Sequence, residues 1–211
     1  MSPPGTLYVI SAPSGTGKTT LVKALVESTP GVTVSISHTT RAQRPAETHG
    51  INYYFVSPDE FDRMTEHNDF LEHATVFGNS YGTSRRWVNE TLATGPDVIL
   101  EIDWQGAQQI KHLLPESISI FILPPSVTDL YQRLIKRNQD NHDIIKQRIA
   151  DVRESTVHLG EYDYVVINDD FSAALNDLQT IVRAGRLLQE RQTIKFAKLL
   201  TQLSTAKVDE L

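Results

Sequence analysis

A loop able to bind phosphate groups is predicted at residues 12–20, which read Ala12-Pro13-Ser14-Gly15-Thr16-Gly17-Lys18-Thr19-Thr20. Its two glycine residues permit backbone angles and close approaches that other residues forbid, so successive amide N–H groups can converge on phosphate oxygens. Lys18 would place a positive charge on the phosphates, and the Thr19 hydroxyl would serve as a ligand of Mg²⁺. This pattern predicts a nucleoside triphosphate as the ligand.

The flanking residues suit such a loop. The apolar run Leu7–Ile10 precedes it, and a helix-like pattern with Leu21 and Leu25 follows it. The N-terminal end of that helix would add partial positive charge. The usual motif begins with glycine, whereas this chain has Ala12 there. A turn that binds nothing is the alternative, but a lysine directly after Gly17 favours phosphate binding.

Two acidic residues end another apolar run, Val98–Asp103. Because side chains alternate along a strand, Glu101 and Asp103 project from the same face at its carboxyl end, where open α/β sheets bind their ligands. A carboxylate there can hold Mg²⁺, directly or through water, beside a phosphate-binding loop. A solvated sheet edge would also show two acids. Together with the loop, they become candidate metal-site residues.

A second anion-binding site is indicated by the stretch Ser37–Pro45, which contains Arg41 and Arg44. Two guanidinium groups three residues apart can bind one phosphate group. The hydroxyls of Tyr53 and Tyr81 could add hydrogen-bond donors. By itself, the stretch would be interpreted as an exposed basic turn.

Length and composition indicate an ordinary globular protein with one core. The chain has 211 residues, of which 39% are hydrophobic and 22% charged, and its net charge of −6 argues against a nonspecific nucleic-acid or anionic-membrane surface. It has no cysteine, which excludes disulfides and thiolate chemistry. Neither a signal peptide nor a membrane-spanning apolar stretch is evident, so we expect a cytoplasmic protein.

The order of apolar segments predicts the fold class. Branched apolar runs recur at 7–10, 32–36, 98–102, 118–123 and 164–167, mostly separated by helical patterns. This alternation predicts an α/β protein with a buried parallel sheet. Two segments interrupt it: 38–92 contains alternating stretches typical of a small antiparallel insertion, and 133–160 is helical and highly charged. A final pattern that includes Leu178, Leu187 and Leu188 predicts a long helix packed on the sheet.

Further motifs occur along the chain in a characteristic order. They are Ser37-x-Thr-Thr-Arg41-x-x-Arg44, Gly50-x-x-Tyr53, Phe70-Leu-Glu72, Asn79-x-Tyr81-Gly82-Thr83, Leu100-Glu-Ile-Asp103-x-Gln-Gly106 and the segment 162–169. With these motifs the sequence resembles the guanylate kinase family over nearly its whole length. The resemblance implies a three-layer P-loop kinase fold with a parallel sheet core, a small mixed α/β GMP-binding insertion and a helical lid.

The resemblance also implies which residues bind GMP. Its phosphate would be held by Arg41, Arg44, Tyr53 and Tyr81. The guanine and ribose side would be surrounded by Ser37, Glu72, Thr83 and Asp103, and we include Glu101 in the GMP-binding set. Guanine presents adjacent N–H donors that one ionised carboxylate can accept together, whereas adenine lacks this paired edge. Glu72 is therefore the expected guanine selector, although an exposed loop acid would look the same in this segment.

The charged segment resembles the family's lid. Arg133 and Arg137 lie one helical turn apart, and Arg148 follows on the next helical stretch. The resemblance implies that Arg137 lies near the adenine and phosphates of ATP and that Arg148 reaches the transferring group. Solvated helical arginines are the alternative. Asn138 stands where many relatives have glycine, so the turn there is expected to differ.

The resemblance also implies residue roles and domain bounds. Catalytic roles are expected for Lys18, Arg41, Arg137 and Arg148, and ATP binding for residues 12–20, Arg137 and Asn168. Asn168 would lie close to the adenine side, though a strand-end turn explains it equally well. The core would comprise 1–37, 93–132 and 161–211, the GMP-binding insertion 38–92, and the lid 133–160.

The expected activity is Mg²⁺-dependent transfer of a phosphoryl group from ATP to GMP or dGMP, in purine nucleotide metabolism. Expected partners are these nucleotides, without nucleic acid or membrane, and the oligomeric state stays open. Two alternatives remain. One is a noncatalytic guanylate-kinase-like module that binds a partner peptide. The other is a nucleoside-monophosphate kinase of different base preference, against which Glu72 argues.

Overall fold

The computed structural model describes residues 3–136 and 152–206. Its larger sheet has five parallel strands in the order β2-β7-β1-β8-β9. The strands are β1 (Leu7–Ser11), β2 (Val32–Val34), β7 (Asp97–Glu101), β8 (Ile118–Leu123) and β9 (Tyr164–Ile167). The predicted α/β fold with a parallel sheet is confirmed.

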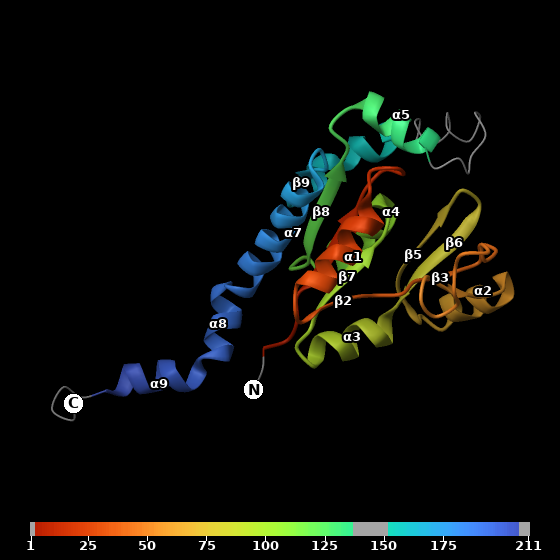
Figure 1. Cartoon of the computed structure of the whole chain (residues 1–211). Helices are drawn as coiled ribbons and strands as arrows, with labels where there is room; N and C mark the ends of the chain where they lie inside the picture. Colours follow the sequence, from red (N-terminus) through yellow and green to blue (C-terminus); the bar gives the residue numbers. More distant parts are fainter. Residues whose placement is uncertain (1–2, 137–151, 207–211) are drawn as a thin grey trace.

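Helices cover both faces of this sheet and make three layers (Figure 1). Alternate β1 side chains show why: Tyr8 and Ile10 pack into one apolar core, and Leu7 and Val9 into another. The first core lies against α1 (Lys18–Ser28) and α7 (Phe171–Arg186), the second against α3 (Arg85–Ala93) and α4 (Trp104–Leu113). A strand buried on both faces has the continuous apolar sequence seen here.

A second sheet of four strands, in the order β4-β3-β6-β5, lies beside the core (Figure 1). Its strands are β3 (His38–Thr39), β4 (Tyr54–Phe55), β5 (Phe70–Val76) and β6 (Asn79–Ser84). The helix α2 (Pro58–Glu66) lies between β4 and β5 in the sequence. The predicted antiparallel pairing is found for β3 with β6 and for β5 with β6, whereas β3 and β4 run parallel. The intervening residues 40–53 are long enough for the crossover that parallel strands require.

The C-terminal helices extend away from the body (Figure 1). They are α8 (Gln189–Lys195) and α9 (Ala197–Thr205). The predicted packing of Leu187 and Leu188 on the sheet was wrong, since they are 62% and 52% exposed. The physical reason is that α7 ends at Arg186, and Arg186 and Arg191 both bind Asp97 at the beginning of β7, so Leu187 and Leu188 lie at the edge of the sheet rather than over it.

The remaining elements are α5 (Val127–Lys136), a helical stretch at 152–157 and the 3₁₀ helix η1 (His158–Glu161). Leu130 and Leu134 of α5 are fully buried and form a small apolar cluster with Val152. None of the helices within the described ranges is long and apolar enough to cross a membrane.

Candidate active site

The phosphate loop connects the end of β1 with the beginning of α1. Gly15 and Gly17 have φ values of 92° and 94°, in the left-handed region that favours glycine. Within the loop, the Thr16 hydroxyl donates to the Pro13 carbonyl at 3.0 Å. The loop therefore leads into the first turn of α1, whose N–H groups lack intrahelical partners and favour an anion.

Lys18 extends from α1 to the carboxyl end of β7. Its Nζ donates to the Ile102 carbonyl at 3.4 Å. Burial lowers the pKa of Lys18, whereas the nearby carboxylates of Glu101 and Asp103 raise it. The ammonium group thus lies between the phosphate loop and the two predicted acids.

Thr19 and Glu101 meet at this edge of the sheet. The Thr19 hydroxyl donates to Glu101 Oε2 at 3.0 Å. A hydroxyl and a carboxylate are the hard oxygen ligands that Mg²⁺ prefers, so this pair fits the ion beside a bound polyphosphate. Within residues 3–136 and 152–206, no group of three or more His, Cys, Asp or Glu side chains could hold a metal by itself.

The Asp103 carboxylate caps the N-terminus of α4, whereas Glu101 binds Thr19. Its Oδ1 accepts from the Gly106 N–H at 3.1 Å as the N-cap of the helix, and its Oδ2 accepts from Gln105 at 3.0 Å. An N-cap carboxylate satisfies an otherwise unpaired N–H and favours the helix dipole. Of the two predicted acids, Glu101 is therefore the one that faces the phosphate loop.

Glu72 lies on β5, with its carboxylate against Gly106 of α4, and is only 4% exposed. Its Oε1 accepts from the Thr83 hydroxyl of β6 at 2.5 Å. The pKa of Glu72 is raised to about 7, because burial disfavours the charged form and Asp103 adds repulsion, while the Thr83 hydrogen bond acts in the opposite direction. The structure thus provides a buried carboxylate held by a neighbouring hydroxyl.

Arg41 pairs with Glu47, a residue that the sequence reasoning missed. Arg41 Nη2 lies 2.7 Å from Glu47 Oε1, and the Arg44 backbone N–H donates to Glu47 Oε2 at 2.9 Å. The hydrogen bond to Glu47 raises the pKa of Arg41. The available signal was an acid six positions after Arg41 and three after Arg44, a spacing that allows a local ion pair and a turn hydrogen bond.

Two tyrosines lie beside this pair. The Arg41 guanidinium carbon is 5.5 Å from the centre of the Tyr53 ring, within cation–π range, and the rings of Tyr53 and Tyr81 are 5.9 Å apart. The Ser37 carbonyl accepts from the Tyr54 N–H at 2.9 Å, which ties the entry of the second sheet to β4. The side chain of Arg44 is exposed.

Asn168 follows β9 and is 6% exposed. Its side-chain Nδ2 donates to the Thr16 carbonyl at 2.6 Å, so Asn168 lies directly behind the phosphate loop. The predicted lid residues Arg137, Asn138 and Arg148 lie outside the described residues.

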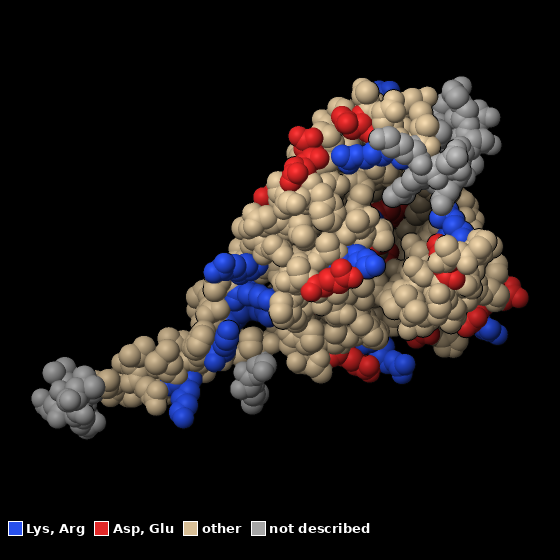
Figure 2. All heavy atoms as spheres, viewed as in Figure 1, with Lys and Arg blue, Asp and Glu red and all other residues tan. Residues whose placement is uncertain are grey.

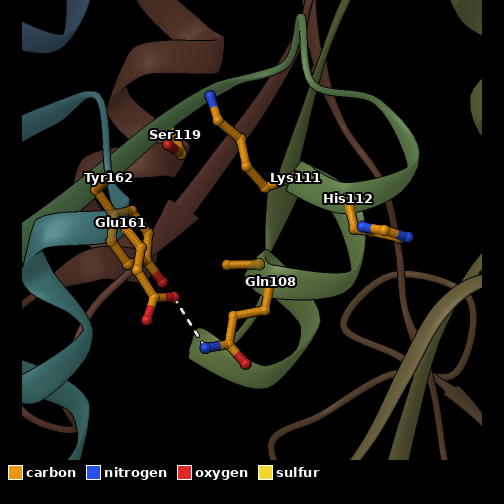
Figure 3. Close-up of a pocket in the computed structure, with 7 residues that line it drawn as sticks. Gln108, Lys111, His112, Ser119, Glu161 and Tyr162 are labelled. Atoms are coloured by element: carbon orange, nitrogen blue, oxygen red, sulfur yellow. Dashed lines mark hydrogen bonds between the residues drawn. The ribbon is translucent and has the colours of Figure 1, made fainter.

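Acidic side chains are visible within a recess between the second sheet and the body (Figure 2). A separate cavity of about 360 Å³ lies between α4 and the segment before β9 (Figure 3). Two of its lining side chains have ionic or amide partners: Gln108 donates to Glu161 at 2.9 Å, and Lys111 binds Asp163 at 2.9 Å.

A phosphate loop at the carboxyl edge of a parallel sheet, beside a small second sheet with a buried carboxylate, defines a P-loop nucleotide kinase. The guanylate kinase family model matches residues 4–185. The chain belongs to the guanylate kinase family, and it is an ATP:GMP phosphotransferase.

Individual relatives support this assignment. The chain is 57% identical over 199 residues to the guanylate kinase of Pseudomonas fluorescens (strain Pf0-1), which covers 94% of this chain and 97% of the relative. It is 54% identical over 203 residues to that of Saccharophagus degradans, covering 96% and 99%. The crystal structure of guanylate kinase from Anaplasma phagocytophilum has 32% identity, a TM-score of 0.76 and 90% coverage of both chains.

Proposed function

We propose that the phosphoryl transfer from ATP to GMP depends on Mg²⁺. The protein would accept dGMP as well and serve purine nucleotide metabolism in the cytoplasm. The observation that carries the proposal is the position of β7. Its carboxyl end contacts the phosphate loop through Lys18 and Glu101, and the α4 helix that follows it contacts Glu72 through Gly106. One strand end therefore connects the donor and acceptor sites.

On the donor side, residues 12–20 bind the polyphosphate of ATP through backbone N–H groups and the Lys18 ammonium. Thr19 and Glu101 would hold Mg²⁺, which neutralises charge on the phosphates when bound. Lys18, already placed between loop and acids, provides fixed positive charge without reorganisation during transfer.

On the acceptor side, Glu72 accepts the paired N–H donors of guanine, and Thr83 holds its carboxylate in place. Arg41, Arg44, Tyr53 and Tyr81 bind the phosphate. Glu47 pairs with the Arg41 guanidinium and accepts from the Arg44 backbone N–H, so the GMP phosphate would compete with the Glu47 carboxylate for Arg41. The base and the phosphate are the same in dGMP, which is why dGMP is expected to react.

The acceptor oxygen of GMP is already anionic near neutral pH, so the reaction needs alignment and charge neutralisation rather than a strong base. Residues 38–92 act as the GMP-binding unit, and 133–160 as a lid that contributes Arg137 and Arg148. Asn168 completes the donor site next to the phosphate loop.

The test is a coupled assay of ADP formation with GMP, dGMP, AMP, UMP and CMP offered separately, with and without Mg²⁺. Turnover is expected with the two guanine nucleotides and only with Mg²⁺, and Lys18→Ala should abolish it. Glu72→Gln should reduce the preference for GMP, because the amide cannot accept both N–H donors. An unchanged preference in that variant would show that another residue selects the base.

A further inference from the structure

The Thr16 carbonyl oxygen accepts hydrogen bonds from two side chains that are distant in sequence. Asn168 Nδ2 donates to it at 2.6 Å, and Arg133 Nη1 donates at 3.3 Å. Arg133 Nη2 also donates to the Asn168 backbone carbonyl at 2.9 Å. The phosphate loop, α5 and the residue that follows β9 are therefore joined in one hydrogen-bond network.

Asn168 is held at its backbone as well as at its side chain. Its N–H donates to the Leu123 carbonyl at the end of β8 at 2.8 Å, which anchors it to the core sheet. Thr16 and Asn168 are 1% and 6% exposed. Because a buried carbonyl without a partner is costly, a satisfied network of this kind holds the peptide in one orientation.

The geometry of the peptide bond links this network to the ligand side of the loop. In a planar trans peptide, the carbonyl oxygen and the following N–H point in opposite directions. With the Thr16 oxygen held by Asn168 and Arg133, the Gly17 N–H points away from both. Gly17 directly precedes α1, so this N–H lies next to the unpaired N–H groups of the first helical turn.

The loop fits these neighbours closely. A Cβ atom on Gly17 would come within 2.6 Å of Asn168 Nδ2, and one on Gly15 within 2.8 Å of Leu134 and 3.0 Å of Leu130. Leu130, Arg133 and Leu134 lie on one face of α5, at i, i+3 and i+4. Apolar contacts and the guanidinium of the same helix therefore support the loop from behind.

We propose that Asn168 and Arg133 are positioning residues that hold the Thr16–Gly17 peptide with its N–H directed at the polyphosphate. This role concerns the donor site and rests on the proposed binding of ATP in the phosphate loop. Such positioning would affect the binding of every polyphosphate ligand, whether or not a base is attached. A contact between Asn168 and adenine would affect only ligands that carry the base.

The experiment compares the binding of Mg²⁺-ATP with that of Mg²⁺-tripolyphosphate, which has no base, by titration calorimetry. The variants are Asn168→Ala, Arg133→Met and the double variant, with the exposed Asn176→Ala on α7 as the control. Thermal unfolding and GMP affinity report whether each variant is folded. Loss of tripolyphosphate binding in Lys18→Ala would show that tripolyphosphate binds in the phosphate loop.

Asn168→Ala is expected to weaken both ligands by the same factor, roughly tenfold, as for the loss of a buried hydrogen bond. Arg133→Met should weaken both as well, and the double variant should lose less than the product of the two factors, because both residues share one acceptor. Asn176→Ala should bind both ligands normally. Across the series, kcat should fall together with phosphate affinity.

The outcomes separate the two proposals. Weaker ATP binding with unchanged tripolyphosphate binding in Asn168→Ala would overturn the inference and place Asn168 on the base. If Asn168→Ala does not fold, unchanged tripolyphosphate binding in Arg133→Met would overturn it equally. A wild-type protein that binds neither ligand in a Lys18-dependent way would remove the donor site itself, and the inference with it.

Discussion

The Glu72 carboxylate lies directly against Gly106, with no room for a side chain between them. A Cβ atom on Gly106 would come within 2.4 Å of Glu72 Oε2. The N–H of the same glycine donates to the Asp103 carboxylate. Gly106 thus connects the proposed guanine selector to the N-cap of α4, and through it to the end of β7.

Gly106→Ala is therefore expected to displace the Glu72 carboxylate and raise KM for GMP about tenfold, the effect of weakening one charged hydrogen-bonding pair. KM for ATP should not change. In an unobstructed helix the same substitution would stabilise the protein by roughly 0.5–1 kcal/mol. Steady-state kinetics with each substrate varied in turn measures the effect.

Gly160→Ala is the matched control, because no atom lies within 4 Å of the position its Cβ would occupy. Glu72→Asp, added to Gly106→Ala, shortens the acid and should restore part of the affinity for GMP. An unchanged KM for GMP in Gly106→Ala would show that Glu72 can move without cost.

The affinity for the guanine base should depend on pH around the raised pKa of Glu72, about 7. The protonated acid cannot accept both N–H donors, so binding is full above this pKa and weakens as pH falls, about tenfold per pH unit below it. Guanosine is the appropriate probe, because the phosphate of GMP titrates in the same range. A Glu72→Gln variant should bind guanosine weakly with a flat pH profile; a sloping profile there would assign the titration to another group.

The Thr19–Glu101 pair predicts how Mg²⁺ dependence changes. Glu101→Gln removes the charge beside the Thr19 hydroxyl, so the Mg²⁺ concentration for half-maximal activity should rise, about tenfold for one lost charge-assisted contact. Thr19→Ser keeps the hydroxyl and should retain the wild-type dependence. A Mg²⁺ titration at fixed ATP and GMP decides, and a normal curve for Glu101→Gln would remove Glu101 from the metal site.

Asp97 is expected to matter for stability rather than for catalysis. Its carboxylate is 1% exposed and binds Arg186 at 2.7 Å and Arg191 at 2.8 Å, which ties α7 and α8 to the sheet. Removing one partner of a buried ion pair costs about 3–5 kcal/mol. Asp97→Asn should therefore unfold at a clearly lower denaturant concentration.

The control for Asp97 is the exposed pair of Lys23 and Glu27, 3.9 Å apart on α1. Lys23→Ala should change the free energy of unfolding by less than about 1 kcal/mol. Kinetic constants of Asp97→Asn should be normal at temperatures where the protein is folded. Equal unfolding curves for Asp97→Asn and Lys23→Ala would contradict the structural role.

The sheet could be predicted from the sequence because the apolar pattern of each strand lies within a few consecutive residues. Strands buried on both faces have continuous apolar runs, as in Leu7–Ser11 and Ile118–Leu123. The end of the last long helix was not predictable in this way. Leu187 and Leu188 continue the apolar pattern, but the tertiary structure leaves them exposed beside the pairing of Arg186 with Asp97, which is 89 positions away in the sequence.

The sequence by itself determined the chemistry: glycines that allow the loop, a lysine and hydroxyl that follow, and acids at a strand end, because residue type and short spacing specify what a segment can bind. Tertiary structure decided the assignments among them. Glu101 rather than Asp103 faces Thr19, Glu47 pairs with Arg41, and Asn168 lies behind Thr16. Such contacts join chain segments through packing, and local periodicity carries no information about which atoms meet.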